Sequence, residues 1–172
     1  MSSELRIAIS GKSGCGNSTV SRLVAESLGL RLINYTFRNI AAEQGITFEE
    51  VCRRAQLDYS YDRELDKKQV EMALEGSCVL GSRLAVWMLK EADLKVYLYA
   101  SPEVRAERIR VREGGDFEDV LKRTEARDAR DSKRYEEIYG IDNDSYDFVD
   151  LVIDTDNLKP EEIAAIITGK VS

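Results

Sequence analysis

The 172-residue sequence contains no histidine, only three cysteines and only two prolines. Because Cys15, Cys52 and Cys78 show no paired spacing, neither a zinc site nor a disulfide framework is expected. No run of 18 apolar residues occurs, and the N-terminus has no signal-peptide apolar core. The net charge of −7 argues against a basic surface for nucleic acid. We therefore expect a cytoplasmic monomer that binds neither membranes nor nucleic-acid polymers, while small anionic ligands remain possible.

What is present fits one globular domain, with 43% apolar and 33% charged residues. Strand-like segments alternate with helical ones along the chain. The five expected strands are residues 5–10, 30–35, 77–81, 94–100 and 148–154. This alternation predicts an α/β fold in which a five-stranded parallel sheet carries helices on both faces.

A glycine-rich segment follows the first expected strand and precedes a helical pattern. Residues 11–19 read Gly-Lys-Ser-Gly-Cys-Gly-Asn-Ser-Thr, close to the phosphate-binding P-loop pattern G-x-x-x-x-G-K-[ST]. Backbone N–H groups and the positive end of the following helix would hold phosphates there, and Ser18 occupies the Mg²⁺ position. The alternative is a glycine-rich turn that binds no ligand. The residues expected to bind phosphates in this loop are Gly11, Ser13, Gly14, Cys15, Gly16, Asn17, Ser18 and Thr19.

The P-loop lysine is missing, because Asn17 stands in its place. Losing one preorganised donor from a transition-state site costs roughly a hundredfold or more in rate. Lys12 is the candidate replacement, although it could equally be a solvated loop lysine. Cys15 has a separate interest, since a loop near a helix N-terminus can lower the pKa of a thiol.

A second cluster of candidate residues lies on one predicted helix after Gly114-Gly115. Arg123, Arg127, Arg130 and Arg134 share a face of that helix. They are either a solvated, ion-paired surface or an anion clamp on a mobile helix with the glycine pair as its hinge.

Two further arginines follow expected strands, at the edge of the sheet where ligands of open α/β folds bind. Arg83 comes after the third strand and Arg38 after the second, and each could instead be a surface residue. Residues 37–76 form a helical stretch that is too long for one crossover helix.

Taken together, these segments resemble the archaeal-type cytidylate kinases, within the nucleoside monophosphate kinases of the adenylate-kinase-like P-loop fold. The resemblance covers nearly the whole chain. It is carried by Phe37-Arg38, Asp62-Arg63-Glu64-Leu65-Asp66, Ser82-Arg83-Leu84-Ala85, residues 100–109, Arg112-Glu113-Gly114, residues 127–134 and Tyr139-Gly140-Ile141-Asp142.

The resemblance implies transfer of the γ-phosphoryl group of MgATP to CMP or dCMP. It implies a core of residues 1–36, 77–111 and 135–172, a monophosphate-binding lobe at 37–76 and a short lid at 112–134. The acceptor would be bound by Arg38, Arg83, Arg127, Asp131 and Arg134. Arg83, Arg127 and Arg134 would be catalytic, and Arg108 would contact the donor nucleotide. Lys12 joins the catalytic residues on its position in the loop, as the candidate for the missing lysine.

The chain departs from the family in its site. Asn17 replaces the P-loop lysine, and Gly81-Ser82 replaces a Glu-Gly pair before the arginine. Three functions are therefore considered: an active cytidylate kinase with a relocated cation, a catalytically weak or inactive nucleotide-binding sensor of the same fold, or a P-loop kinase of another small molecule.

Overall fold

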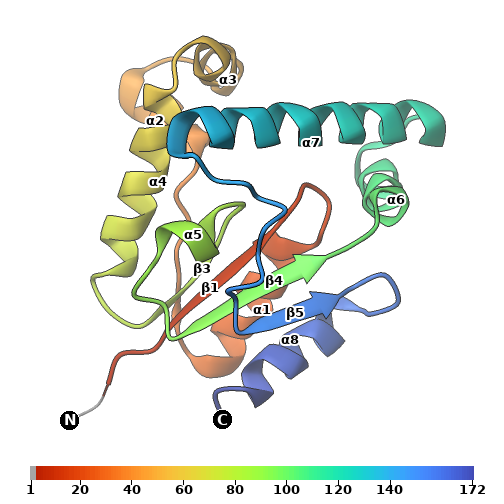
Figure 1. Cartoon of the computed structure of the whole chain (residues 1–172). Helices are drawn as coiled ribbons and strands as arrows, with labels where there is room; N and C mark the ends of the chain where they lie inside the picture. The colour runs from red at the N-terminus through yellow and green to blue at the C-terminus, as the bar shows by residue number, and fades with distance from the viewer. Residues whose placement is uncertain (1–2) are drawn as a thin grey trace.

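The structure is a computed structural model that describes residues 3–172. At its centre is a parallel five-stranded sheet (Figure 1) of order β2-β3-β1-β4-β5. The strands are β1 (Arg6–Gly11), β2 (Arg31–Leu32), β3 (Cys78–Gly81), β4 (Leu94–Tyr99) and β5 (Leu151–Asp154). The predicted α/β fold with five parallel strands is confirmed, although β2 and β5 are shorter than expected.

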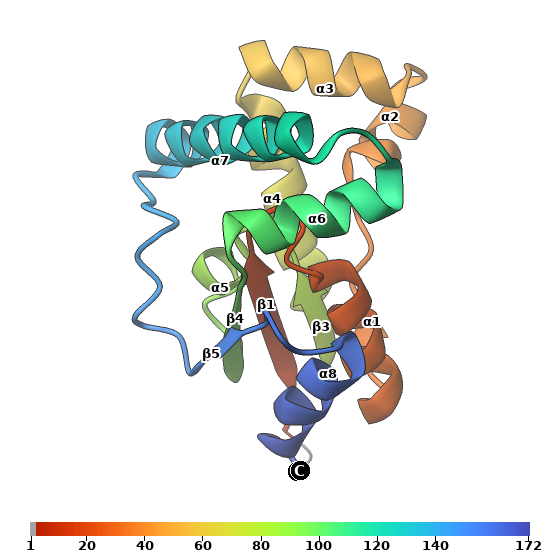
Figure 2. The same ribbon diagram turned by 90° about the vertical axis from the view of Figure 1, so that its right-hand side faces the viewer.

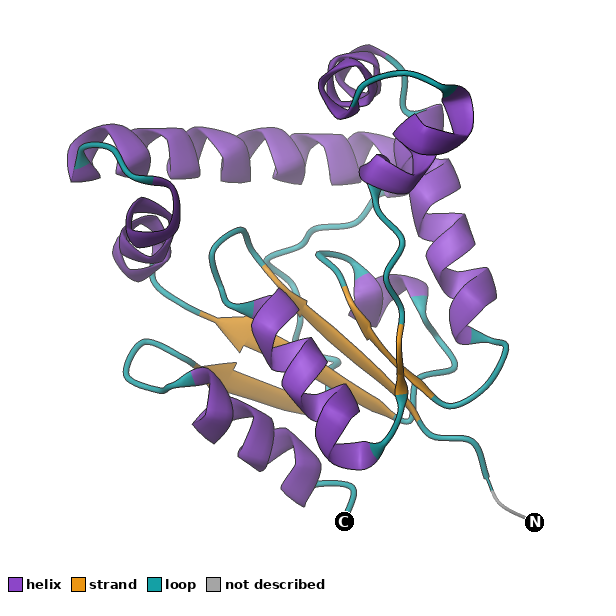
Figure 3. Cartoon of the chain, turned by 180° about the vertical axis from the view of Figure 1, so that it is seen from behind, coloured by secondary structure: helices purple, strands orange, loops and turns teal. Residues whose placement is uncertain are grey.

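Helices cover both faces of this sheet, and alternate residues of β1 point to opposite faces. Ile7 and Ile9 pack with α1 (Asn17–Leu28) and α8 (Pro160–Gly169), whereas Ala8 belongs to the core on the other face, with α5 (Ala85–Met88). Figure 3 shows α1 and α8 side by side in front of the sheet. This two-sided burial follows from the period-two alternation of side chains along a strand.

The long polar stretch after β2 folds into three helices with a small core of their own. They are α2 (Phe37–Gln44), α3 (Phe48–Leu57) and α4 (Ser60–Ala73). Ile40 and Val51 are fully buried in this core. These helices occupy residues 37–73, and the assignment of 37–76 as a lobe stays a prediction.

The remaining helices, α6 (Pro102–Glu113) and α7 (Phe117–Tyr139), lie beyond the end of the sheet at which β1 enters the glycine-rich loop (Figure 2). Between them, Gly114 and Gly115 have φ of 84° and 104°, which favours glycine at both positions. The predicted lid border at residue 134 falls inside α7, which runs unbroken to Tyr139. None of the helices over residues 3–172 has the length and apolar character that crossing a membrane requires.

Candidate active site

The loop between β1 and α1 leads directly into the start of a helix. The N-cap of α1 is Gly16, with φ 88°, so no side chain caps the first turn of the helix. Gly14 has φ 82°, and a Cβ atom there would lie 2.8 Å from the carbonyl oxygen of Arg105. The hydroxyl-bearing Ser18 and Thr19 are exposed in the first turn of α1. The backbone amides at this helix end are therefore suited to hold phosphate oxygens.

The side chain of Asn17 is bound to the protein itself. Its Nδ2 donates to the carbonyl oxygens of Ile9 at 2.9 Å and Ser82 at 3.3 Å, and its Oδ1 accepts from Ser21 Oγ at 2.7 Å. A Cβ atom on Gly81 would lie 2.2 Å from Ser21 Oγ and 2.6 Å from Asn17 Oδ1. The two departures from the family pattern, at positions 17 and 81, are therefore one packing arrangement.

Lys12 lines the cavity over the loop, but its ammonium has a partner elsewhere. Its Nζ lies 2.6 Å from Oδ1 of Asp144, which follows α7. The structure thus keeps the lysine next to the loop and pairs its charge with a carboxylate. Whether Lys12 replaces the missing lysine stays a prediction.

The pKa of the Cys15 thiol differs from the sequence-based expectation. Its side chain is 2% exposed, and burial raises the pKa of its thiol above the ordinary value, despite a backbone hydrogen bond from Asn17 and nearby arginines that act in the opposite direction. The expected lowering of this pKa is wrong, because desolvation of the thiolate is the larger effect.

Two arginines of α6, Arg105 and Arg108, donate hydrogen bonds to backbone carbonyl oxygens of the loop. Arg105, 3% exposed, donates to the carbonyl oxygens of Ala100 and Ser13 at 3.1 Å each and forms a bidentate pair with the carboxylate of Asp128 on α7, at 3.1 and 2.7 Å. It therefore joins the end of β4, the loop and α7. Sequence reasoning missed this residue, and its only signal is its place within the family-like segment 100–109.

Arg108, expected to contact the donor nucleotide, is also bound to the backbone. It donates to the carbonyl oxygen of Cys15 at 3.3 Å and to the carbonyl and hydroxyl oxygens of Thr155 at 2.7 and 3.1 Å. Its side chain lines a separate cavity of about 330 Å³ beside the loop, with Thr19 and Pro160. A contact with the donor nucleotide stays a prediction.

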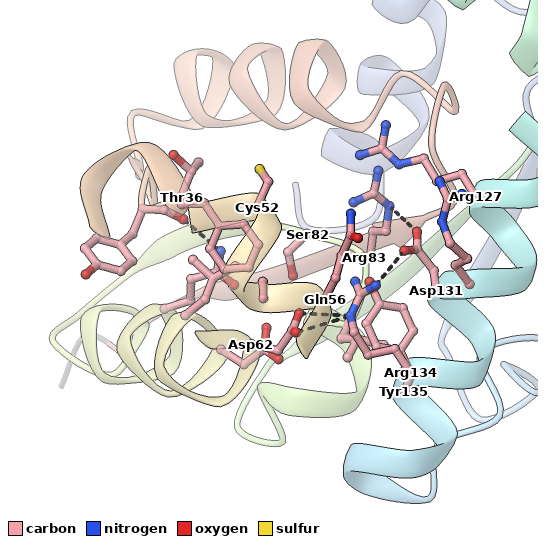
Figure 4. A pocket seen from close by; sticks show the side chains of 18 of the residues that line it. Thr36, Cys52, Gln56, Asp62, Ser82, Arg83, Arg127, Asp131, Arg134 and Tyr135 are labelled. Atoms are coloured by element: carbon pink, nitrogen blue, oxygen red, sulfur yellow. Dashed lines mark hydrogen bonds and ion pairs between the residues drawn. The ribbon is translucent and has the colours of Figure 1, made fainter. Parts of the chain in front are cut away.

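A third cavity, of about 500 Å³ and called the acceptor pocket below, lies between α2, α3, α4 and α7 (Figure 4). Asp131 forms ion pairs with two arginines of this pocket. Arg83 Nε lies 3.4 Å from Oδ2 of Asp131, and Arg134 Nη1 lies 3.2 Å from its Oδ1. Arg134 also pairs with Asp62 of α4 through Nε, at 3.2 Å. The structure therefore brings together Arg83, Asp131 and Arg134, three of the residues that the family resemblance places on the acceptor side.

Arg127 differs from these arginines because it makes no hydrogen bond or ion pair within residues 3–172. Partial burial and, secondly, the charge of Arg83 lower the pKa of its guanidinium, although the nearby Asp131 opposes them. A guanidinium held near another one without a direct partner is suited to receive an anion.

The cavity over the loop and the acceptor pocket share an edge. The residues that line both are Phe48, Cys52, Gly81, Ser82, Arg83 and Arg127. Arg38 lines only the loop cavity and lies 4.0 Å from the centre of the Phe48 ring, and Arg112 at the end of α6 joins it there. Four arginines thus surround the place where a phosphate on the loop would meet a ligand of the acceptor pocket.

Comparison with known proteins finds relatives along nearly the whole chain. The chain is 50% identical over 171 residues to cytidylate kinase 2 of Borreliella afzelii, covering 97% of this chain and 96% of that one. It is 40% identical over 170 residues to cytidylate kinase of Pyrococcus horikoshii, covering 98% and 88%. Among solved structures, shikimate kinase of Bacteroides thetaiotaomicron superposes with a TM-score of 0.64 at 15% identity, covering 98% and 99%, which supports a P-loop kinase fold.

A family model described as the cytidylate kinase-like family matches residues 6–157, a range that contains the loop, the acceptor pocket and all five strands. Because that match spans most of the chain and the relatives align over nearly its full length, the chain belongs to the cytidylate kinase-like family.

Proposed function

We propose that this protein transfers the γ-phosphoryl group of ATP to CMP, with dCMP as a second acceptor. The observation that carries the proposal is the shared edge of the two cavities, where Arg83 and Arg127 face both the loop and the acceptor pocket. Two phosphates that meet there need charge neutralisation and alignment, which are the main contributions of a protein to phosphoryl transfer.

ATP fits the loop because a glycine-capped helix end offers backbone amides to its phosphates. Ser18 is the residue that would hold Mg²⁺, which would supply positive charge at the phosphates when bound. Lys12 and Arg108 are proposed to contact the donor side.

On the acceptor side, Arg38 and Arg83 are proposed to hold the monophosphate, and Arg127 and Arg134 to neutralise the charge that develops during transfer. Asp131 would keep Arg83 and Arg134 oriented through the two pairs already described. The glycine pair Gly114-Gly115 would let α7 close over the site and exclude water. We further propose that the protein acts as a cytoplasmic monomer on nucleotides alone.

A coupled assay with ATP and CMP, dCMP, UMP or AMP tests the proposal. Wild type is expected to turn over CMP fastest, dCMP next, and the other two slowly. If wild type turns over none of them while Asn17→Lys does, the protein is a nucleotide-binding sensor and the proposed activity is wrong. Isothermal titration of ATP and CMP into the same preparations separates loss of binding from loss of turnover.

A further inference from the structure

One side-chain oxygen in the acceptor pocket has no hydrogen-bond partner. Asp62, in the first turn of α4, is 5% exposed and lines this pocket (Figure 4). Arg134 Nε donates to Oδ1 at 3.2 Å, while Oδ2 is fully buried and accepts no hydrogen bond from any residue that the structure describes. Oδ2 lies 3.2 Å from the same nitrogen, so Arg134 balances the charge of Asp62 without satisfying this oxygen.

An unsatisfied oxygen on a buried carboxylate is unfavourable, and proteins rarely keep one without a use. The guanidinium of Arg134 does not remove the cost, because it is shared with Asp131. Burial therefore raises the pKa of Asp62 despite the opposing effect of Arg134. A ligand that brings an N–H or O–H group to Oδ2 would satisfy it.

The position of Asp62 within the pocket indicates which part of a nucleotide that group belongs to. The phosphate end of the pocket is the edge shared with the loop cavity, where Arg83 and Arg127 lie. Asp62 and Gln69 of α4 and Phe37 of α2 line the acceptor pocket but not the loop cavity. An acceptor whose phosphate lies at the shared edge therefore extends its base toward α4, against aromatic and apolar side chains that suit a planar ring.

We propose that Oδ2 of Asp62 accepts a hydrogen bond from the exocyclic amine of the acceptor's cytosine, and that this contact selects cytidine over uridine nucleotides. The inference rests on the proposed function. Uracil carries a carbonyl oxygen where cytosine carries the amine, so a uridine nucleotide would place two acceptors against each other. A site built around a buried hydrogen bond rejects an analogue that cannot make it far more strongly than an apolar pocket rejects a difference in size.

The first test uses wild-type protein and a changed ligand. Isothermal titration compares CMP with the 5′-monophosphate of 2-pyrimidinone riboside, which lacks only the amine. We expect the analogue to bind at least about 30-fold more weakly. Equal affinities would overturn the proposal. Because this test measures binding, it stays informative even if no acceptor is turned over and the proposed activity fails.

The second test changes the protein. Asp62→Asn keeps the shape and one oxygen for Arg134, but presents an N–H group that matches uracil. The ratio of kcat/KM for CMP to that for UMP is expected to fall at least about a hundredfold, and the loss of the amine from CMP should no longer weaken binding. The control is Asp66→Asn, one turn along α4, since its Oδ2 already accepts from Tyr139 at 2.7 Å. This control should leave the CMP/UMP ratio unchanged.

Two results would contradict the assignment. If Asp62→Asn lowers kcat/KM for CMP and UMP by the same factor, Asp62 only positions Arg134. If it changes the ratio of CMP to dCMP instead, Oδ2 binds the ribose 2′-hydroxyl. Circular dichroism and a thermal melt of each variant show whether the compared proteins are folded.

Discussion

The polar side chains around the loop and those in the acceptor pocket differ in whether they have hydrogen-bond partners within the protein. Around the loop, Asn17, Arg105 and Arg108 use their donors on backbone carbonyl oxygens. In the acceptor pocket, by contrast, the structure leaves Oδ2 of Asp62 and Nε of Arg83 without hydrogen bonds from the residues it describes. The loop side chains therefore shape the site, whereas the pocket side chains are available to a ligand.

This difference bears directly on the missing P-loop lysine. The amide at position 17 is fully used by Ile9, Ser82 and Ser21 and has become structural. Arg127 of α7 and Arg83 after β3 line the edge that the two cavities share. The contrast predicts that substitutions on the pocket side reduce catalysis, while substitutions on the loop side reduce stability.

The largest expected effect is that of Arg127→Ala on the pocket side. Because this guanidinium has no partner among the described residues and faces both cavities, its loss should lower kcat/KM for CMP by about a thousandfold, as for other arginines that stabilise transferring phosphoryl groups. The melting temperature should not fall. Steady-state kinetics with thermal unfolding checks both. Arg123→Ala, four residues earlier on α7, is the matched control, and a thousandfold loss there as well would remove the distinction between the two arginines.

On the loop side, Arg105→Ala should mainly destabilise the protein. It leaves the carboxylate of Asp128 and the carbonyl oxygens of Ser13 and Ala100 without their donor, and breaking one partner of a buried pair typically costs about 3–5 kcal/mol. Urea unfolding measures the change in free energy. The control is Arg110→Ala on the same helix, where a solvent-exposed pair with Glu107 contributes little to stability. Similar losses for the two variants would contradict the structural role of Arg105.

Substitution of Asp66 is expected to stabilise the protein, whereas Arg105→Ala destabilises it. The reason is that burial raises the pKa of the Asp66 carboxyl to about 6. The unfolded chain releases this proton near pH 4, so folding is penalised increasingly as pH rises from 4 to 6, and fully above that. Asp66→Asn should therefore raise the free energy of unfolding by about 3 kcal/mol at pH 7 and by only about 0.5 kcal/mol at pH 4. Denaturant titrations at both pH values test this, and a gain that does not depend on pH would assign the effect to another cause.

Gly81→Ala tests whether positions 17 and 81 form one packing unit. The added Cβ would lie 2.2 Å from Ser21 Oγ, so the variant should lose about 1–3 kcal/mol of stability. Ser21→Ala in the same chain should recover part of that loss, measured in a double-mutant cycle. Gly76→Ala is the control, since its Cβ would meet only a side-chain nitrogen of Arg31, at 3.8 Å. Additive effects of the two substitutions at 81 and 21 would refute the shared packing.

The same contrast explains how much of the site could be predicted from sequence. The loop, the sheet and the arginine face of α7 follow local rules of spacing, whereas the family resemblance, not spacing, grouped Arg83 with Asp131 and Arg134. The roles of Asn17 and Arg105 depend on atoms from segments 65 and 23 residues away along the chain. No local pattern contains such contacts, so neither role could be read from the sequence.

Substitution of Lys12 has the smallest expected effect on kinetics. Its ammonium is paired with a carboxylate, so it is neither bound to backbone oxygens, like the loop side chains, nor without a partner, like Arg127. If its ammonium reaches the donor phosphates, it must share its charge with Asp144, and we expect Lys12→Ala to raise KM for ATP by about tenfold, or 1.4 kcal/mol. Asp144→Asn should act in the opposite direction and lower that KM, because it releases the ammonium. If both variants leave ATP kinetics unchanged, the lysine only anchors the chain after α7, and the arginines provide all the positive charge that position 17 lacks.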